Sequence, residues 1–388
     1  MRTLTLMLAL LAACSPLDRG PSEDRPDGPV PVHHGTNLLA KPDAVDALVL
    51  PILEDRGVGM GVAVVHDGEV VFSGGYGWAD LGDARPLTAG TPMQIGSVSK
   101  LFIGVAAMQA RDRGDLSLDD PIADLVGFAV DNPLVEDDVI TLRALLMHNG
   151  GIHDSGEYDR AYANGDPTVS LLDFQRSYLL PGGERYHVRN FTKVGSGTFE
   201  YSNVGAALAG LGLAETAGLE FSDLVHRDIL EPLGMSHSAY FVDDLAVEMA
   251  TPYGGGDRPF GVYSFPTYPD GLMRSSSTDM GRFMAAIQAG GVLDDTRILE
   301  EATVEEMLTV DESSGTDEDG QAISWARVAL VEGRTLMGHT GGDPGVASLF
   351  AMDRDAGVGV VLTANSVDLD LHAVVEAYGA LFDLERAP

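Results

Sequence analysis

Residues Gln94–Gly104 read QIGSVSKLFIG, a glycine-led turn that opens into an apolar helix. Ser97 and Lys100 stand three positions apart, so on a helix their side chains share one face. A serine hydroxyl is a weak nucleophile until a neighbour accepts its proton, and a lysine partly buried on an apolar face has a lowered pKa and can be that neighbour. The free N–H groups of a helix start can also stabilise an oxyanion. The segment predicts a nucleophilic serine with a lysine partner.

Two further segments downstream strengthen this interpretation. Tyr201-Ser202-Asn203 stands between a glycine-rich approach and an apolar helix, and His339-Thr340-Gly341-Gly342 precedes a C-terminal hairpin. In this order, the Ser-x-x-Lys, Tyr-x-Asn and His-Thr-Gly segments resemble the three active-site elements of the serine β-lactamase and penicillin-binding-protein superfamily, in particular its class C-like branch. The resemblance runs from about residue 45 to the end of the chain. It includes supporting segments at 114–121, 140–151 and 231–235.

The resemblance implies a role for each matched residue. Ser97 would be the acylated nucleophile and Lys100 its proton acceptor or electrostatic partner. Tyr201 would shuttle protons to the leaving group and later from the attacking water. A free phenol has a pKa of about 10, so this role requires nearby positive charge, which we expect from Lys100 and His339. Asn203 would orient Lys100 and contact a substrate amide.

The remaining matched residues would form the substrate-binding edge. His339 and Thr340 would line a strand that the substrate joins by β-augmentation, continued by Gly341. The backbone N–H of Gly342 would pair with that of Ser97 as the oxyanion hole.

The hydrophobic patterning predicts a mixed α/β (α+β) fold of the β-lactamase/transpeptidase type. Residues 60–66 and 69–73 read as strands joined by Asp67-Gly68, and residues 347–352 and 358–363 as a second hairpin, followed by a helix near 369–384. Helical patterns lie between these strands, at 98–112, 141–147, 203–217, 222–231 and 278–289. We expect an antiparallel sheet built from both chain ends with flanking helices, and an inserted, mainly helical region at about 115–265.

The N-terminus reads as a lipoprotein leader. Residues 1–13 have the basic start and short apolar run of a signal peptide, and Leu11-Ala12-Ala13-Cys14 resembles a bacterial lipobox with Cys14 as the acylated residue. An ordinary secretory signal with an incidental cysteine is the alternative. Residues 14–43 are rich in Pro, Asp, Gly and Ser and predict a flexible tether, with His33-His34 as solvated linker. The hydrolase domain is then 44–388, lipid-anchored at a periplasmic, outer-membrane or cell surface.

Composition excludes several classes of protein. The 24 basic and 59 acidic residues among 388 give a formal charge of −35. This charge makes nucleic acid a poor partner and mildly disfavours anionic substrates. A single cysteine excludes an internal disulfide framework and a cysteine-rich metal site, and no cofactor or metal is expected. No serine has the flanking glycines of an α/β-hydrolase nucleophile.

Some site residues have simpler structural interpretations. Ser97 could cap its helix, and His339 could be an ordinary packed or turn histidine. Tyr162-Ala163-Asn164 repeats the Tyr-x-Asn pattern within the acidic stretch 154–166, and we interpret it as surface loop. His148 and His153 flank Asn149-Gly150-Gly151 and could face the cleft, but a helix C-terminal cap is the favoured interpretation. The acidic residues 317–320 are interpreted as a solvated loop.

The sequence thus predicts a serine hydrolase that forms an acyl-enzyme on a peptide, amide or ester, including peptidoglycan-derived substrates. His339 stands where most β-lactamases have lysine, and histidine is only partly charged near neutral pH. D-amino-acid peptidase, D,D-carboxypeptidase or esterase activity therefore ranks above class C-like β-lactamase activity. A non-catalytic cell-wall-binding lipoprotein remains the alternative outside enzymes.

Overall fold

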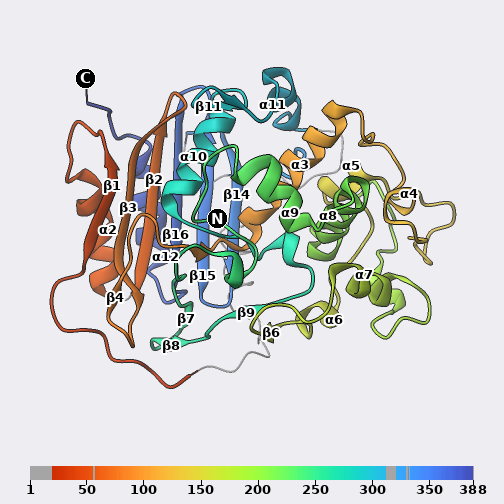
Figure 1. Ribbon diagram of the computed structural model, residues 1–388, viewed down its shortest axis with the longest axis horizontal. Helices are drawn as coiled ribbons and strands as arrows, with labels where there is room; N and C mark the ends of the chain where they lie inside the picture. The colour runs from red at the N-terminus through yellow and green to blue at the C-terminus, as the bar shows by residue number, and fades with distance from the viewer. Residues whose placement is uncertain (1–19, 56, 312–319, 329–330, 332, 388) are drawn as a thin grey trace.

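The computed structural model describes residues 20–387 apart from 56, 312–319, 329, 330 and 332. Its centre is an antiparallel sheet in the order β1-β3-β2-β16-β15-β14-β13, with β4 paired to β3 outside this path. These strands are β1 (Val32–Asn37), β2 (Gly59–His66), β3 (Glu69–Asp80), β4 (Arg85–Pro86), β13 (Ala326–Val328), β14 (Leu336–Asp343), β15 (Val346–Asp353) and β16 (Val358–Ala364). Because β2 lies beside β16 (Figure 1), the prediction of a sheet assembled from both chain ends is confirmed.

Both predicted hairpins form, and the turn residues of the first explain its geometry. Asp67 and Gly68 connect β2 to β3 with φ angles of 48° and 76°. A two-residue type I′ turn needs this left-handed conformation at both positions. The second hairpin joins β15 to β16, with Asp353 paired to Val358. Every residue of β16 is buried, which accounts for its unbroken apolar run.

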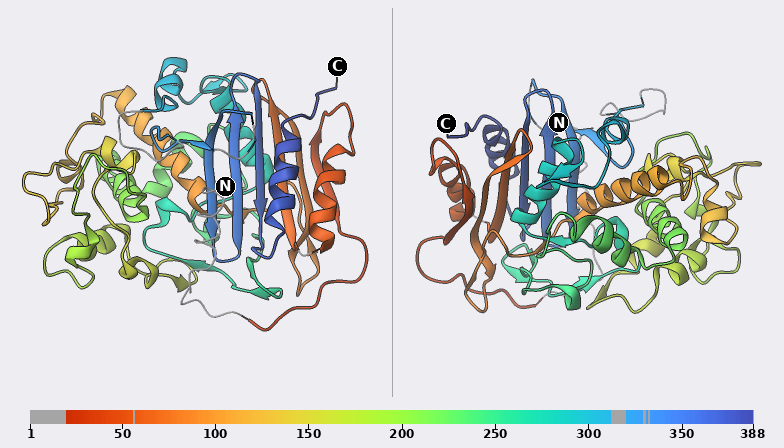
Figure 2. Two further views of the ribbon diagram at one scale, coloured as in Figure 1. Left: turned by 180° about the vertical axis from the view of Figure 1, so that it is seen from behind. Right: turned by 45° about the horizontal axis from the view of Figure 1, so that its top comes forward.

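Helices cover both faces of the sheet (Figure 2). α2 (Ala44–Asp55) and α12 (Leu371–Leu381) pack on one face, and α10 (Ser277–Gln288) packs on the other against β2, β3 and β16. Val361 and Leu362 are neighbours on β16 but belong to different hydrophobic clusters, because successive side chains of a strand point to opposite faces. The sheet is therefore the middle layer between two hydrophobic cores.

A mainly helical region lies beside the sheet, at the right of Figure 1. Its elements are η1 (Gly96–Ser99), α3 (Lys100–Arg113), α4 (Ile122–Val126), α5 (Leu142–Leu146), α6 (Gly156–Asp159), α7 (Leu171–Leu179), η2 (Val188–Asn190), α8 (Asn203–Ala217), α9 (Phe221–Val225), η3 (His226–Leu230) and η4 (Val242–Asp244). The predicted helix at 203–217 coincides with α8, which packs against α3, α4 and α5. Most of these elements fall within 115–265, the range given to the predicted insert.

The remaining elements are short. They are β5 (Met93–Gln94), β6 (Ala163–Asn164), β7 (Tyr253–Gly254), β8 (Arg258–Pro259), β9 (Tyr263–Ser264), η5 (Tyr268–Asp270), β10 (Arg274–Ser275), β11 (Val292–Leu293), β12 (Thr296–Arg297) and α11 (Glu301–Met307). In the described part of the chain, their strands form four separate two-stranded sheets, β5 with β10, β6 with β9, β7 with β8 and β11 with β12.

Among the described residues, no single helix is long and apolar enough to cross a bilayer. Only α8 and the following 221–230 segment, which are bent by 77° relative to each other, pass that test as a pair.

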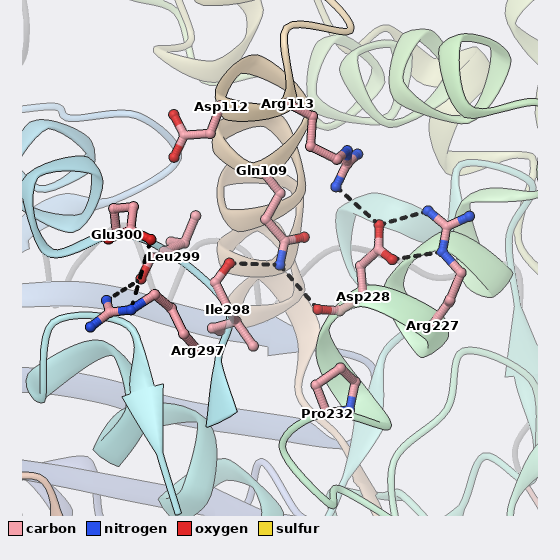
Figure 3. A pocket seen from close by; sticks show the side chains of 10 residues that line it. All are labelled: Gln109, Asp112, Arg113, Arg227, Asp228, Pro232, Arg297, Ile298, Leu299 and Glu300. Carbon is pink, nitrogen blue, oxygen red and sulfur yellow. Dashed lines mark hydrogen bonds and ion pairs between the residues drawn. The ribbon is translucent and has the colours of Figure 1, made fainter. Parts of the chain in front are cut away.

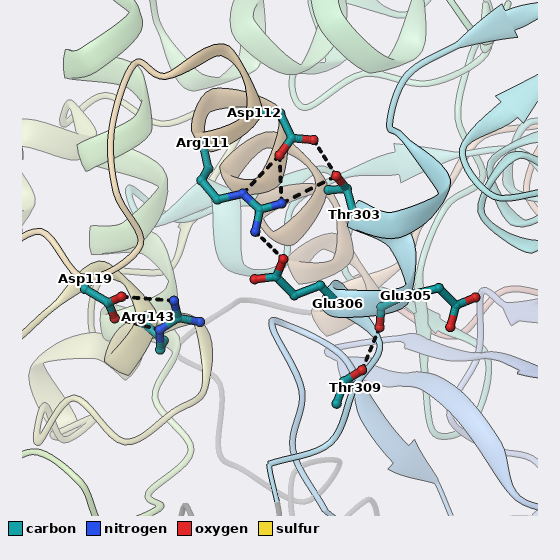
Figure 4. A network of polar contacts seen from close by, with 8 residues as sticks. All are labelled: Arg111, Asp112, Asp119, Arg143, Thr303, Glu305, Glu306 and Thr309. Atoms are coloured by element: carbon teal, nitrogen blue, oxygen red, sulfur yellow. Dashed lines mark hydrogen bonds and ion pairs between the residues drawn. The ribbon is translucent and has the colours of Figure 1, made fainter.

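Surface ion pairs tie the end of α3 to α11 (Figure 4). Arg111 donates to Asp112 Oδ1 at 2.7 Å and to Glu306 Oε2 at 2.5 Å. A separate pair links Arg143 to Asp119, and its hydrogen bonds lower the pKa of Asp119 because they favour the carboxylate. Exposed pairs of this kind each contribute little to the free energy of folding.

The predicted tether is wrong from Gly20 onward. Residues 32–37 form β1, which pairs with β3 and extends the sheet, and Gly20 N donates to Pro259 O at 2.9 Å. His34, interpreted as solvated linker, contacts Asp46 Oδ1 through Nε2 at 2.8 Å. Backbone pairing to the free edge of β3, together with this contact to α2, holds the segment on the domain. Cys14 and the predicted signal peptide lie outside the described residues.

Candidate active site

Ser97 lies in η1, the 3-10 turn that leads into α3. Gly96 opens this turn with a φ of 52°, a conformation that glycine adopts without strain. Lys100 Nζ donates to Ser97 Oγ at 3.1 Å, so the two residues meet in space as their spacing predicts. The capping alternative for Ser97 is wrong, because the cap positions fall on Ile95 and Ser99 and neither side chain makes a capping hydrogen bond.

Lys100 is almost fully buried, with 1% relative exposure. Its Nζ lies 2.7 Å from Asn203 Oδ1 and 2.7 Å from the backbone oxygen of Asp270, besides the contact with Ser97. Three acceptors match the three N–H groups of the charged ammonium. In the neutral amine, two N–H groups can still donate to Asn203 Oδ1 and to the backbone oxygen of Asp270, and the lone pair then faces the serine hydroxyl. The same geometry therefore accommodates the lysine before and after it takes a proton from Ser97.

Tyr201-Ser202-Asn203 forms the entrance to α8. Ser202 is the N-cap of this helix, and its Oγ accepts a hydrogen bond from Gly205 N at 2.9 Å. The cap places Asn203 at the first helical position, where its Oδ1 meets Lys100. The fold thus brings the second predicted segment onto the first.

Tyr201 is half-buried and packs against basic side chains. The centroid of its ring lies 4.3 Å from that of His148 and 6.1 Å from that of His339, and Lys100 Nζ lies 5.0 Å from it. His148 follows α5 with a φ of 54°, and its Nδ1 accepts from Ser202 N at 3.2 Å. His148 therefore takes the left-handed position that ends α5, as the cap interpretation expects, and its ring also lies in the site.

β14 carries the third predicted segment. β13 pairs only with residues 336–338 of β14, so from His339 to Asp343 that side of β14 has no strand partner among the described residues. A Cβ added at Gly96 would lie 3.0 Å from Gly342 N, and one added at Gly341 would lie 3.2 Å from Ser97 N. The glycines therefore let η1 and β14 approach closely, which brings the two predicted oxyanion-hole segments together.

The two imidazoles of the site are neutral at neutral pH. Burial, with a smaller effect of the Lys100 charge, lowers the pKa of His339 to about 4. The same two causes lower the pKa of His148 well below its usual value. His339 Nδ1 lies 2.6 Å from Thr340 O and donates to it, which leaves Nε2 as an acceptor. The expected positive charge from His339 at Tyr201 is therefore wrong, and Lys100 supplies the cation there.

Two buried carboxyl groups lie next to this cluster. Asp270, in η5, gives its backbone oxygen to Lys100 and accepts from Tyr158 OH at 3.3 Å. Burial raises the pKa of Asp270 to about 7, although the Lys100 charge opposes this shift. Asp343 ends β14, and burial raises its pKa to about 8. Both groups were missed because no local motif marks a buried aspartate.

The position of Tyr162 differs from the surface-loop interpretation of residues 162–164. Ala163 and Asn164 are exposed and form β6, but Tyr162 is half-buried, and its OH donates to Asp343 Oδ1 at 2.9 Å. The surface-loop interpretation is therefore wrong for the tyrosine, which lies against the end of β14. His153 pairs with Glu200 and is about half exposed.

A cavity of about 410 Å³ lies elsewhere, at the far end of α3 (Figure 3). Gln109 bridges its wall by donating to Asp228 O and Ile298 O, each at 3.0 Å. No predicted site residue lines this cavity. Within the described part of the chain, no three His, Cys, Asp or Glu side chains come together in a way that could hold a metal ion.

Comparison with known proteins identifies relatives of this chain. The Beta-lactamase family model matches residues 45–383. Beta-lactamase-like protein 2 of Dictyostelium discoideum is 27% identical over 277 residues, covering 66% of this chain and 47% of that protein. Putative beta-lactamase-like 1 of Homo sapiens is 26% identical, covering 68% and 53%. The chain thus spans about half the length of these two relatives. A beta-lactamase of Pseudomonas fluorescens is 23% identical over 381 residues, covering 88% and 98%.

Solved structures show the same fold. The octameric penicillin-binding protein homologue from Pyrococcus abyssi superposes with a TM-score of 0.67 at 22% identity, covering 88% of this chain and 77% of that one. D-alanine carboxypeptidase AmpC from Burkholderia cenocepacia gives a TM-score of 0.67 at 21% identity, covering 88% and 98%. The family match over residues 45–383 shows that the chain belongs to the beta-lactamase family, and the solved structures share its fold.

Proposed function

We propose that this chain is a serine hydrolase that forms an acyl-enzyme on Ser97 with a peptide, amide or ester. The observation that carries the proposal is the hydrogen-bonded line from Ser97 Oγ through Lys100 Nζ to Asn203 Oδ1. The attack of Oγ on the carbonyl carbon uses the neutral form of the Lys100 amine, which takes the hydroxyl proton, and the C=O electron pair moves onto oxygen. The N–H groups of Ser97 and Gly342 would bind that oxyanion.

The proton then passes to the leaving group. As the scissile bond breaks, Tyr201 gives its proton to the departing nitrogen or oxygen and is reprotonated from Lys100. Lys100 Nζ lies over the Tyr201 ring, 5.0 Å from its centroid, and is not hydrogen-bonded to the tyrosine OH, so this transfer requires the OH to approach the amine. In deacylation, a water molecule gives a proton to the same pair as its oxygen attacks the acyl carbon of the ester. The bond between that carbon and Ser97 Oγ then breaks, the acid is released, and Oγ takes the proton back from the pair. Asn203 Oδ1 holds Lys100, which leaves the amide nitrogen to donate to a substrate carbonyl.

His339 bears on the class of substrate. A neutral imidazole provides no fixed cation for the carboxylate of a β-lactam, and its Nε2 is an acceptor. This favours peptidase action on D-amino-acid peptides and amides, or esterase action, over β-lactam hydrolysis. The name of the Burkholderia structure, a D-alanine carboxypeptidase, supports the peptidase candidate.

Mass spectrometry of the protein after exposure to a fluorophosphonate, and separately to penicillin, tests the proposal. We expect a fluorophosphonate adduct on Ser97 that is absent in Lys100→Ala. Adducts at other residues only, or none with either probe, would favour the alternative of a non-catalytic wall-binding protein. A panel of D-Ala-D-Ala peptides, D-amino-acid amides, short acyl esters and nitrocefin then separates peptidase, esterase and β-lactamase activity.

A further inference from the structure

Asp154 is a carboxylate at the start of α8 that the proposed mechanism does not use. Its Oδ2 accepts from Asn203 N at 2.7 Å, and its Oδ1 accepts from Val204 N at 3.0 Å and from Ser202 Oγ at 2.9 Å. Donors from three successive residues thus converge on one side chain. These residues directly follow Tyr201 and include Asn203, the partner of Lys100.

The helix does not need Asp154 as its only cap, because Ser202 Oγ already accepts from Gly205 N. Asp154 instead connects the turn to a distant part of the chain, 49 positions from Asn203. His148, from the same loop, accepts from Ser202 N at 3.2 Å. Two residues of the loop that follows α5 therefore hold the backbone on which both Tyr201 and Asn203 stand.

Holding a carboxylate here costs free energy, because burial raises the pKa of Asp154. The hydrogen bonds from Asn203, Val204 and Ser202, and the charge of Lys100, offset that cost. A half-buried acceptor with three donors restricts the turn more tightly than a fully solvated cap would.

We propose that Asp154 is a positioning residue: its carboxylate fixes the turn at Ser202–Val204 and so holds Asn203 Oδ1 on Lys100 and the ring of Tyr201 in the site. The inference rests on the proposed function, since Asp154 acts on the acylation of Ser97 through Asn203 and Tyr201. Small misplacement of reacting groups by a change outside the chemistry can cost about 100-fold in rate.

Two substitutions in the full chain separate positioning from folding. Asp154→Ala removes all three acceptor contacts. Asp154→Asn keeps one carbonyl oxygen but replaces the other with an NH₂ group, which cannot accept from Asn203 N. Asp370→Ala is the matched control, because Asp370 caps α12 by accepting from His372 N at 3.0 Å and Ala373 N at 3.2 Å on the far face of the sheet.

The experiment measures the rate of fluorophosphonate labelling of Ser97 at saturating probe, the probe concentration for half that rate, and the melting temperature. We expect the labelling rate at saturating probe to fall about 100-fold in Asp154→Ala and by a smaller factor in Asp154→Asn. In both variants the probe concentration for half that rate should stay unchanged. In Asp370→Ala we expect neither the rate nor that concentration to change. If Asp154→Ala does not fold, Asp154→Asn decides the question.

Other results would overturn the inference. Wild-type labelling rates in a folded Asp154 variant would show that the contact does not position the site, and an equal loss in Asp370→Ala would show a general effect of helix capping. An unlabelled wild-type protein would instead overturn the proposed function itself, so the two failures are distinguishable.

Discussion

Lys100 Nζ and Asn203 Oδ1 lie 2.7 Å apart although 103 positions separate the two residues in the chain. The contact joins the first turn of α3 to the first turn of α8, and both helices begin at the site. The amine beside Ser97 is therefore held by tertiary structure rather than by the Ser-x-x-Lys spacing alone.

Asn203→Ala removes one of the three acceptors of the buried Lys100 ammonium. A buried charged donor left without its partner costs about 1–3 kcal/mol or more, so we expect a loss of that size in the free energy of unfolding, measured by urea titration. We also expect slower fluorophosphonate labelling of Ser97. Asn164→Ala, in exposed β6, is the control and should change neither quantity. Unchanged labelling in Asn203→Ala would contradict the role of Asn203.

His339→Lys tests the substrate class. A lysine at this position offers a permanent cation to a carboxylate, whereas His339, with its pKa lowered to about 4, does not. We expect kcat/KM for nitrocefin to rise about tenfold relative to that for a neutral acyl ester, a difference of about 1.4 kcal/mol. We also expect a lower melting temperature, because the new charge is buried near Lys100. An unchanged ratio of the two kcat/KM values would show that this position does not select charge.

The predicted membrane anchoring depends on Cys14, and we propose that this cysteine is acylated. In a Gram-negative host, the full-length protein should incorporate an alkyne-tagged fatty acid and sediment with membranes, and Cys14→Ser should lose both properties. Ser15→Asp keeps the cysteine and is the matched control for acylation. Membrane sedimentation of Cys14→Ser equal to that of the wild type would contradict a lipid anchor at this residue.

The strands and most helices could be predicted because their signals are local. Asp67-Gly68 specifies its own turn, and the buried β16 reads as one apolar run. The meeting of β2 with β16 followed from strands at both chain ends. β1 was missed because its residues, VHHGTN, have little apolar periodicity, and its pairing depends on the free edge of β3.

The residues of the site also divide into those with a local sequence signal and those without one. Ser97, Lys100, Tyr201 and Asn203 could be proposed from short motifs. Asp270 could not, because it contributes a backbone oxygen to Lys100, and any residue type has one. The neutral state of His339 could not be predicted from the sequence either. Its pKa is lowered by burial and by the nearby charge of Lys100, and these two effects exist only in the folded chain.

Asp343 makes the stability of the fold depend on pH. Its pKa in the folded chain is about 8, because burial disfavours the carboxylate, against an ordinary value of 3.8. Below pH 3.8 both the folded and the unfolded chain hold the proton, and the stabilising contribution is complete. Between pH 3.8 and 8 the unfolded chain has lost the proton and the folded chain has kept it, so this contribution decreases as pH rises and is lost by about pH 8.

Asp343→Asn removes this titration while keeping a side-chain oxygen for the hydrogen bond from Tyr162 OH. We therefore expect the melting temperature of Asp343→Asn, relative to the wild type, to rise as pH increases from 5 to 8 and then to level off. A change of about 1 kcal/mol corresponds to about 1–2 °C in a chain of this size, which differential scanning calorimetry resolves. The exposed Asp131→Asn should show no such trend. A constant difference between Asp343→Asn and the wild type over this range would mean that Asp343 is already ionised in the folded chain.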